Sequence, residues 1–367
     1  MKIGVITAYL EQWAPLSLQE SYDNAGLLLG HHSWDCSGVL CCLDVTEAVL
    51  DEAIAKRCNL IVAHHPLIFG GLKRINGNTS IEKVVIKALQ HQIAVYAIHT
   101  NLDNVVDGVN GRIASILGLS NCQVLQPLTH TLKKLIVYVP MSHLEAVRTA
   151  LFEAGAGQVG KYSECSFSST GEGTFKGSLD TKPFVGQPGL RHTEKEARLE
   201  VLLPAYLGPI VLQALHAAHP YEEVAYDLLT LENLNTSIGA GLVGDLPSSI
   251  DESSFLAQLG RLFHVPVVRH SPLCGKPIQR VAVCGGAGHF LISNALKAGA
   301  QVFITSDLKY HDFFKAEGRI LLADVGHFES EQFTIDLLQE ELAKKFPTFA
   351  VLKTSVSTNP VNYLWHK

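Results

Sequence analysis

The sequence has little that would suit a membrane or a nucleic acid. No apolar run among its 367 residues is long enough to cross a bilayer, and its net charge of -6 comes with no block of basic residues. A basic patch is the usual footprint of nucleic-acid binding, so we do not expect a nucleic acid as the main partner. Glu11 interrupts the apolar N-terminus before the apolar segment of a signal peptide could be complete.

The sequence also lacks any Cys-x-x-Cys pair. Its eight cysteines lie at scattered positions, namely 36, 41, 42, 58, 122, 165, 274 and 284. This spacing indicates neither a zinc knuckle nor a disulfide framework. Free thiols in a reducing cytoplasm are the simplest account of these cysteines, so we expect a cytoplasmic protein. Because no apolar run is long enough to cross a bilayer, we expect no membrane partner.

Apolar residues, in contrast, are plentiful. They make up 47% of the chain, which is enough for a large core and argues against disorder. The length allows two or three domains. Seventeen histidines are many for this length, and several fall where predicted strands end.

One stretch, residues 60–69, joins an apolar run to two adjacent histidines. Its first four residues are typical of a buried strand, and Pro66 ends regular structure just after His64 and His65. Consecutive strand side chains point to opposite faces, so the two imidazoles splay apart unless the chain turns. That geometry favours one imidazole on each of two metal ions. For the pair taken alone, a simpler alternative is that one histidine packs and the other caps a turn, because a metal site needs more ligands.

Strand patterns alternate with helical patterns through much of the chain. This alternation predicts an α/β core with a mostly parallel sheet and helices on both faces. In the middle of the chain the order becomes strand, helix, strand, strand, helix, strand, with a loop rich in glycine, proline and lysine near 171–192. That order is the ferredoxin-like pattern. We therefore predict an inserted ferredoxin-like domain at 128–236 within a discontinuous core at 1–127 and 237–367.

Residues 39–103 and 281–331 share one plan, in which strands and helices alternate and two strands end in polar residues. These endings are rich in His, Asp or Glu and lie at 64–65, 99–103, 307–311 and 327–331. Sites in open α/β sheets form beyond the carboxyl ends of strands. The four endings are therefore expected to meet in one place.

Five side chains from these endings make a candidate dinuclear metal set: His64, His65, Asp103, His327 and Glu331. Neutral imidazole suits zinc or iron, and a carboxylate can bridge two cations. Two ions about 3.5–4 Å apart can clamp a substrate oxygen. His327 and Glu331 are four residues apart, so they face one side if a helix begins there.

His99, Asn101 and Asp103 would face the same way in an extended stretch. His99 is thus a candidate sixth ligand, or a partner of the ligands. Both roles of His99 stay open, because neither spacing nor periodicity distinguishes a metal ligand from a residue that contacts the ligands.

For two further motifs we favour a structural explanation over a functional one. The glycine-rich turn at 284–288 follows a strand and opens a helix, as a phosphate-binding turn does, but Leu291 replaces the last glycine of G-x-G-x-x-G. Tight strand-to-helix turns need glycine in any case. The His-Pro-Tyr-Glu-Glu segment at 219–223 could touch a metal or a substrate, and a structured polar turn is the favoured alternative.

Six motifs, spread over nearly the whole chain, are jointly specific; they lie at 22–27, 61–69, 99–103, 218–227, 306–311 and 326–331. With them the chain resembles the Nif-three-like family, also called GTP cyclohydrolase I type 2 homologues. The resemblance implies a dimetal centre on His64, His65, Asp103, His327 and Glu331. It also implies a toroidal homohexamer with sites facing an internal cavity, and an inserted domain like those of the PII and CutA proteins. Ser306 departs from the glycine that is common there and leaves Asp307 in place.

The resemblance further implies an activity, the opening of the imidazole ring of GTP with release of formate. The substrate would be a nucleotide or another small phosphorylated molecule, and two divalent ions, zinc or iron, would serve as cofactors. His99 or Asp307 would move protons, a hypothesis based on their places at strand ends. The alternative is a non-catalytic metal-containing scaffold or regulator. Open coordination positions would favour the hydrolase, and a saturated site would favour the scaffold.

Overall fold

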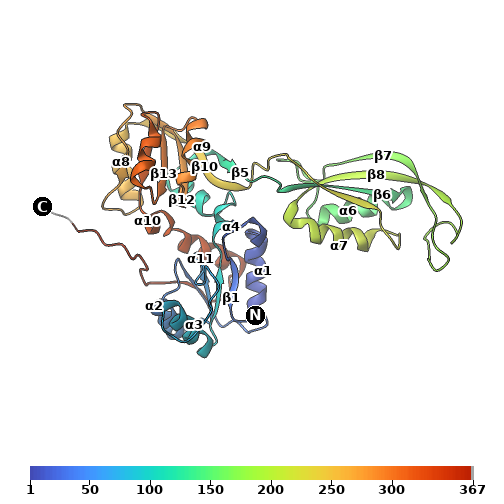
Figure 1. Cartoon of the computed structure of the whole chain (residues 1–367), viewed down its shortest axis with the longest axis horizontal. Coiled ribbons are helices and arrows are strands. Elements are labelled where there is room, and N and C mark those ends of the chain that lie inside the picture. The colour runs from blue at the N-terminus through green and yellow to red at the C-terminus, as the bar shows by residue number, and fades with distance from the viewer. Residues whose placement is uncertain (365–367) are drawn as a thin grey trace. The chain divides into compact units, whose positions relative to one another are not determined.

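The structure, a computed structural model, describes residues 1–364 and divides into two compact units (Figure 1). Unit 1 consists of Met1–Pro127 and Thr236–Lys367, and unit 2 consists of Leu128–Asn235. Within the described residues, no helix is both long and apolar enough to cross a membrane. The last three residues of the predicted core, 365–367, lie outside the described part.

The first sheet of unit 1 has five strands in the order β1-β4-β3-β2-β15. Their bounds are β1 Gly26–Leu29, β2 Val39–Cys42, β3 Leu60–Ala63, β4 Ala94–Ala97 and β15 Val351–Lys353. The strands β15, β2, β3 and β4 run parallel, and β1 pairs antiparallel with β4 at the edge. The helices before the second sheet are α1 Ile3–Trp13, η1 Leu16–Leu18, α2 Glu47–Ala55, α3 Ser80–Gln90, α4 Thr100–Asp103 and α5 Val109–Ile116.

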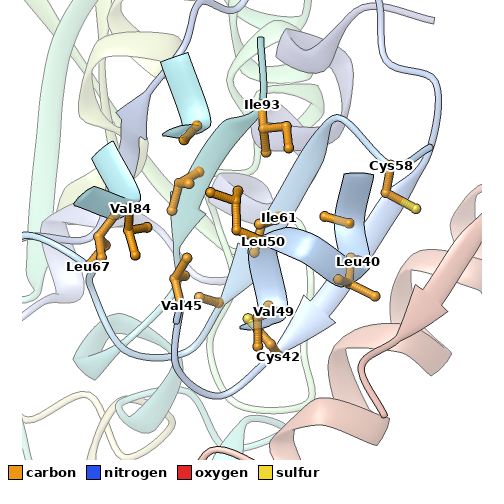
Figure 2. Close-up of a cluster of buried hydrophobic side chains, with 14 of the residues drawn as sticks. Leu40, Cys42, Val45, Val49, Leu50, Cys58, Ile61, Leu67, Val84 and Ile93 are labelled. Atoms are coloured by element: carbon orange, nitrogen blue, oxygen red, sulfur yellow. The ribbon is translucent and has the colours of Figure 1, made fainter. Parts of the chain in front are cut away.

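The inner strands β2 and β3 are buried along their whole length, as parallel strands covered by helices are. Leu40 and Ile61 of these strands pack into one cluster with Val49 and Leu50 of α2 and with Val84 of α3 (Figure 2). Because the cluster holds these strands firmly, the residues that follow their carboxyl ends have well-defined positions.

The second sheet of unit 1 has six strands in the order β11-β14-β13-β12-β10-β5. Their bounds are β5 Ser120–Pro127, β10 Gly239–Ile250, β11 Arg269–His270, β12 Ile278–Ala287, β13 Val302–Ser306 and β14 Leu321–Asp324. Only β12, β13 and β14 run parallel. The helices of this part are α8 Glu252–Leu262, η4 His289–Leu291, α9 Ile292–Lys297, η5 Tyr310–Ala316, α10 His327–Glu331 and α11 Thr334–Lys345.

Unit 2 holds a four-stranded sheet in the order β7-β8-β6-β9, with every neighbouring pair antiparallel. Its elements are β6 Leu132–Pro140, η2 Met141–His143, α6 Leu144–Glu153, β7 Ser166–Phe175, β8 His192–Pro204, η3 Ala205–Leu207, α7 Gly208–Ala218 and β9 Tyr226–Thr230. Helices α6 and α7 lie side by side against one face of the sheet (Figure 1). Val147 of α6 and Leu215 of α7 share a core with Leu135 and Val201 of the strands.

Three details of the expected architecture were wrong. The core holds two sheets rather than one, so the two halves of the predicted site follow strands of different sheets. The antiparallel strands β5 and β10 were not predicted, because the glycines of 239–244 conceal a strand pattern. The loop of unit 2 begins at 176 rather than near 171, because β7 continues through Gly171 and Gly173.

Candidate metal centre

The carboxyl end of β3 presents His64 and His65. Their backbone N–H groups donate to Cys42 and Leu43 at 3.2 and 2.9 Å, so they continue the ladder with β2. The chain then bends, and the two rings lie with centroids 5.0 Å apart instead of on opposite faces. His64 is completely buried and His65 is partly buried.

Helix α10 presents His327 and Glu331 from the other sheet, directly after β14. The helix begins at His327, so the two side chains share one side, as the spacing predicted. His327 Nε2 lies 3.1 Å from Glu331 Oε2 and 3.4 Å from His65 Nε2. The ends of strands from both sheets therefore meet in one cluster within unit 1.

The Glu331 carboxylate is buried at the centre of this cluster. Its Oε2 lies 2.9 Å from His65 Nε2, and its Oε1 lies 3.8 Å from His64 Nε2. The two oxygens thus face different imidazoles. His65, His327 and Glu331 offer three ligand atoms within 4.8 Å of one another, an arrangement that can hold a metal ion.

Every imidazole in the cluster is oriented in the same manner, with Nδ1 hydrogen-bonded to an oxygen. The four bonds are His64 to Ile98 O at 2.9 Å, His65 to Asp44 at 2.7 Å, His99 to Asp23 at 2.7 Å and His327 to Asp307 at 2.6 Å. When Nδ1–H donates to such a partner, the neutral ring keeps the lone pair of Nε2 for a ligand. Metal-binding histidines are typically held in this way.

Two buried atoms of the cluster have no hydrogen-bond partner among the described residues. They are His64 Nε2 and Asp103 Oδ1, which lie 3.8 Å apart. A buried polar atom without a partner costs free energy of about 1–3 kcal/mol. A cation bound between them would satisfy both atoms, so the donor set fits a metal ion.

The carboxylates around two of the imidazoles favour the protonated form of these rings. Burial opposes the charge of His65, but hydrogen bonds with Asp44 and Glu331 outweigh it and raise its pKa to about 9. Burial also opposes the charge of His327, and Asp307 and Glu331 raise its pKa to about 11.

The two carboxylates of the cluster shift in opposite directions. Burial raises the pKa of Asp103 well above its usual value, and the charge of Glu331 adds to this effect. Burial opposes the charge of Glu331, but the imidazoles around it lower its pKa well below its usual range. Because cations and protons compete for the same ring nitrogens, metal binding at this site is coupled to the ionisation of the rings.

The residues of the predicted extended stretch, 99–103, are mostly helical, so that expectation was wrong. Thr100–Asp103 form α4, and Asn101 turns to donate to Ala14 O at 2.7 Å. Asp103 points to His64, whereas His99 bonds Asp23. The His99 ring still lies 5.3 Å from His64 and 5.4 Å from His65, centroid to centroid, and it joins them in a second group able to hold a metal ion.

The glycine-rich turn has a structural explanation. Its N–H groups donate to side chains of the protein, Gly285 to Asn110, Gly286 to Ser330 and Gly288 to Thr305, at 2.9–3.0 Å. These donors are therefore not free for a phosphate. A Cβ on Gly286, whose φ is +63°, would lie 2.3 Å from Glu331 Oε1. Glycine here makes room for the central carboxylate.

The segment 219–223 of unit 2 forms a structured polar turn, which is the alternative that we favoured from the sequence. His219 Nε2 lies 3.0 Å from Tyr138 O, and its Nδ1 accepts from Tyr221 N at 3.1 Å. Both ring nitrogens are thus engaged within the unit, which leaves no lone pair of His219 for a metal.

Sequence reasoning missed Asp44 and Asp23, which orient two of the imidazoles. Asp44 lies two residues after the last residue of β2, so the rule about strand ends could have found it. Asp23 lies in a loop, and nothing in its local pattern points to His99. Asp307, a candidate for proton transfer or for a partner of the ligands, bonds His327 and has a left-handed backbone with φ of 57°, a conformation that clusters at functional sites.

A cavity of about 420 Å³ opens onto the cluster within unit 1. It is lined by His65, His99, Asp103, His327 and Glu331 together with residues of the loops around them. The rings of Tyr22 and Phe69 are stacked at its edge, with centroids 6.3 Å apart, and both are largely exposed. A small molecule in this cavity would meet both the imidazoles and an aromatic surface.

The fold and this cluster define an α/β protein with a histidine–carboxylate site able to hold a metal ion. The chain belongs to the Duf34/NIF3 (NGG1p interacting factor 3) family, whose model matches residues 1–360. It is 39% identical to a GTP cyclohydrolase 1 type 2 homolog of Halalkalibacterium halodurans, over 99% of this chain and 100% of that protein. A protein of the same name in Bacillus subtilis is 38% identical over 98% of both chains.

A solved structure supports the same assignment. The crystal structure of a Bacillus cereus protein related to NIF3 is 35% identical, with a TM-score of 0.87 over 99% of both chains. A Staphylococcus aureus protein is 29% identical, with a TM-score of 0.78 over 99% of both chains. The resemblance found from the sequence motifs is therefore confirmed at the level of the family and its fold.

We predict that Gly286→Ala lowers the metal content of the purified protein at least several-fold, because the added methyl displaces Glu331 Oε1. Gly118→Ala is the matched control. Gly118 has a similar φ of +67° with nothing within 4 Å of an added Cβ, so it adds backbone strain alone. Elemental analysis of both variants measures the effect; equal metal content in the two would contradict it.

We also predict that metal binding at pH 7 releases protons and strengthens as pH rises. The folded pKa values of His65 and His327, about 9 and about 11, lie above pH 7, so both rings carry a proton that bound cations must displace. Zinc added to chelator-treated protein should release at least about two protons per chain, counted by calorimetry in buffers of different ionisation enthalpy. Binding with no proton release would contradict these pKa shifts.

Proposed function

We propose that the cluster binds two divalent cations, zinc or iron, and that the protein is a metal-dependent hydrolase. One ion would be held by His64, Asp103 and Glu331 Oε1, and the other by His65, His327 and Glu331 Oε2. The observation that carries this proposal is the Glu331 carboxylate, whose two oxygens face His64 on one side and His65 with His327 on the other. A bridging carboxylate offsets the charge of two cations, and three protein ligands on each would leave positions for water and substrate.

The protein residues around the ions have distinct proposed tasks. The two ions would supply Lewis acidity, which polarises a substrate oxygen and lowers the pKa of water. His99 is the proposed proton-transfer group, because Asp23 holds its Nδ1 at 2.7 Å and leaves Nε2 for a proton. Asp23 is suited to this role, since bonds with His99 and Thr100 outweigh burial and lower its pKa to about 2. Asp307 orients His327 from its Nδ1 side.

The proposed substrate is a nucleotide or another small phosphorylated molecule. The stacked rings of Tyr22 and Phe69 provide an exposed aromatic surface at the edge of the cavity, and bases stack on such surfaces. The names of the curated relatives point to GTP. The specific proposal is therefore hydrolytic opening of the GTP imidazole ring with release of formate.

The oligomeric state, the cellular location and the type of the inserted domain are further parts of this proposal. We propose a toroidal homohexamer, which light scattering would report as about six times the chain mass of 39.9 kDa. We propose a cytoplasmic protein, consistent with its free thiols. Unit 2 is proposed to be the inserted ferredoxin-like domain of the PII and CutA kind, supported by its strand order and by two helices on one face.

The decisive experiment combines elemental analysis with an assay of formate released from GTP, extended to other nucleotides and phosphoesters. We expect about two metal ions per chain and turnover that a chelator removes. His64→Ala is the control, and it should lose metal and turnover together. A protein that holds its metals but turns over none of these compounds would instead be a metal-containing scaffold.

We predict that His99→Ala slows turnover by about 10²–10⁴-fold, the usual contribution of one proton-transfer group, and leaves the metal content intact. His91→Ala, which removes an exposed histidine at the end of α3, is the control and should change neither. Loss of metal from His99→Ala would show that His99 is a ligand. Unchanged turnover would remove it from the mechanism.

A further inference from the structure

Unit 2 contains a second cavity, of about 620 Å³, whose lining residues all belong to that unit. It lies over strands β7 and β8 and is bounded by the loop 176–191 and the turn 219–223. This volume falls in the range of small-molecule sites. The proposed hydrolase function makes no use of this cavity.

A buried carboxylate, Glu196 of β8, lines the cavity. Only 8% of the residue is exposed. Tyr221 Oη donates to its Oε1 at 2.8 Å, whereas no described residue donates to its Oε2. Burial and the charge of Glu196 raise the pKa of Tyr221, so the phenol keeps the proton that it donates. Oε2 is therefore free to accept a hydrogen bond from a ligand, and a cationic donor makes the strongest such bond.

No residue that the structure describes supplies that cation. Within unit 2, no Lys, Arg or His nitrogen lies within 4.0 Å of Glu196. Arg198, two residues further along the same strand, pairs with Glu200 at 3.0 Å instead. The charge of Glu196 is therefore left for a molecule in the cavity.

Two glycines of β7 make room above this carboxylate. A Cβ on Gly173 would lie 2.0 Å from Glu196 Oε2, so only glycine lets the carboxylate take its place. A Cβ on Gly171, which pairs with Glu196 in the sheet, would meet nothing within 4 Å. The space beside Glu196 is thus open where a side chain would ordinarily fill it.

Aromatic rings form the apolar part of the cavity. Tyr221 lies 6.0 Å from Phe175 and 6.3 Å from Phe184, centroid to centroid, and Tyr138 also lines the space. Phe184 comes from the loop 176–191 and is half exposed. Aromatic faces attract organic cations and pack against their carbon atoms.

The charges that line the cavity favour the same class of ligand. Carboxylates outnumber cationic side chains by four to two, the residues being Glu172, Glu196, Glu222 and Glu223 against Lys176 and Arg198. This excess of negative charge disfavours a phosphate or a carboxylate ligand, because like charges repel at short range.

We propose that this cavity binds a small organic cation, an amine or a guanidine with an apolar body. Its cationic head pairs with Glu196 Oε2, and its body packs among Phe175, Phe184 and Tyr221. Unit 2 is thereby a ligand-binding module with a chemistry separate from that of the metal cluster.

The test is isothermal titration calorimetry of the full-length protein with matched probes. Phenethylamine and agmatine carry the cationic head, 2-phenylethanol is the neutral match and phenylacetate is the anionic match. We expect the two cations to bind at least tenfold more tightly than the neutral and anionic compounds. Failure of both cations to bind, or equal binding of the three phenyl compounds, overturns the proposal. Preferential binding of phenylacetate does so as well.

Variants locate the binding within the protein. Glu196→Gln should weaken the binding of phenethylamine at least tenfold. Phe184→Ala should weaken it several-fold, and this change in a surface loop carries little risk to folding. Glu153→Gln is the matched control, an exposed residue of α6 outside the cavity lining, and should bind as the unmodified protein does. Equal losses in Glu196→Gln and Glu153→Gln, or no loss in Phe184→Ala, would show that the probe binds elsewhere.

Discussion

The buried carboxylate of Glu331 is the constraint on which the rest of the site depends. A charge at that depth is tolerated only when positive partners surround it. The imidazoles of His65 and His327 lie against it, and this contact raises the pKa of each ring. In the proposed centre, cations would displace the protons of these rings and meet the same ligand atoms.

Both sheets of unit 1 contribute side chains to the surroundings of this carboxylate. The first sheet delivers His64 and His65 at the end of β3, and the second delivers His327 and Glu331 after β14. Asp44, Asp23, Asp307 and the carbonyl of Ile98 then fix each ring through Nδ1. Gly286 clears the space that Glu331 occupies. Orientation by neighbours and space made by glycine are as much a part of the site as the ligand atoms themselves.

Local patterns were sufficient to predict which strand endings contribute to the site. His64 and His65 follow an apolar run, and the spacing of His327 and Glu331 indicates one helical side, which α10 confirms. Long-range contacts were not predictable in this way. Thr100–Asp103 become helical where Asp23, far away in sequence, accepts a hydrogen bond from Thr100 N at 3.0 Å. The second sheet gains β10 through a glycine-rich segment whose pairing with β5 and β12 no local propensity encodes.

The central claim is that one carboxylate, Glu331, lies between two cations. Anomalous X-ray diffraction from crystals of the zinc-loaded protein tests it most directly. The account predicts two anomalous peaks, about 3.5–4 Å apart, with one oxygen of Glu331 directed to each. A single peak, or two peaks that do not share Glu331, would contradict it.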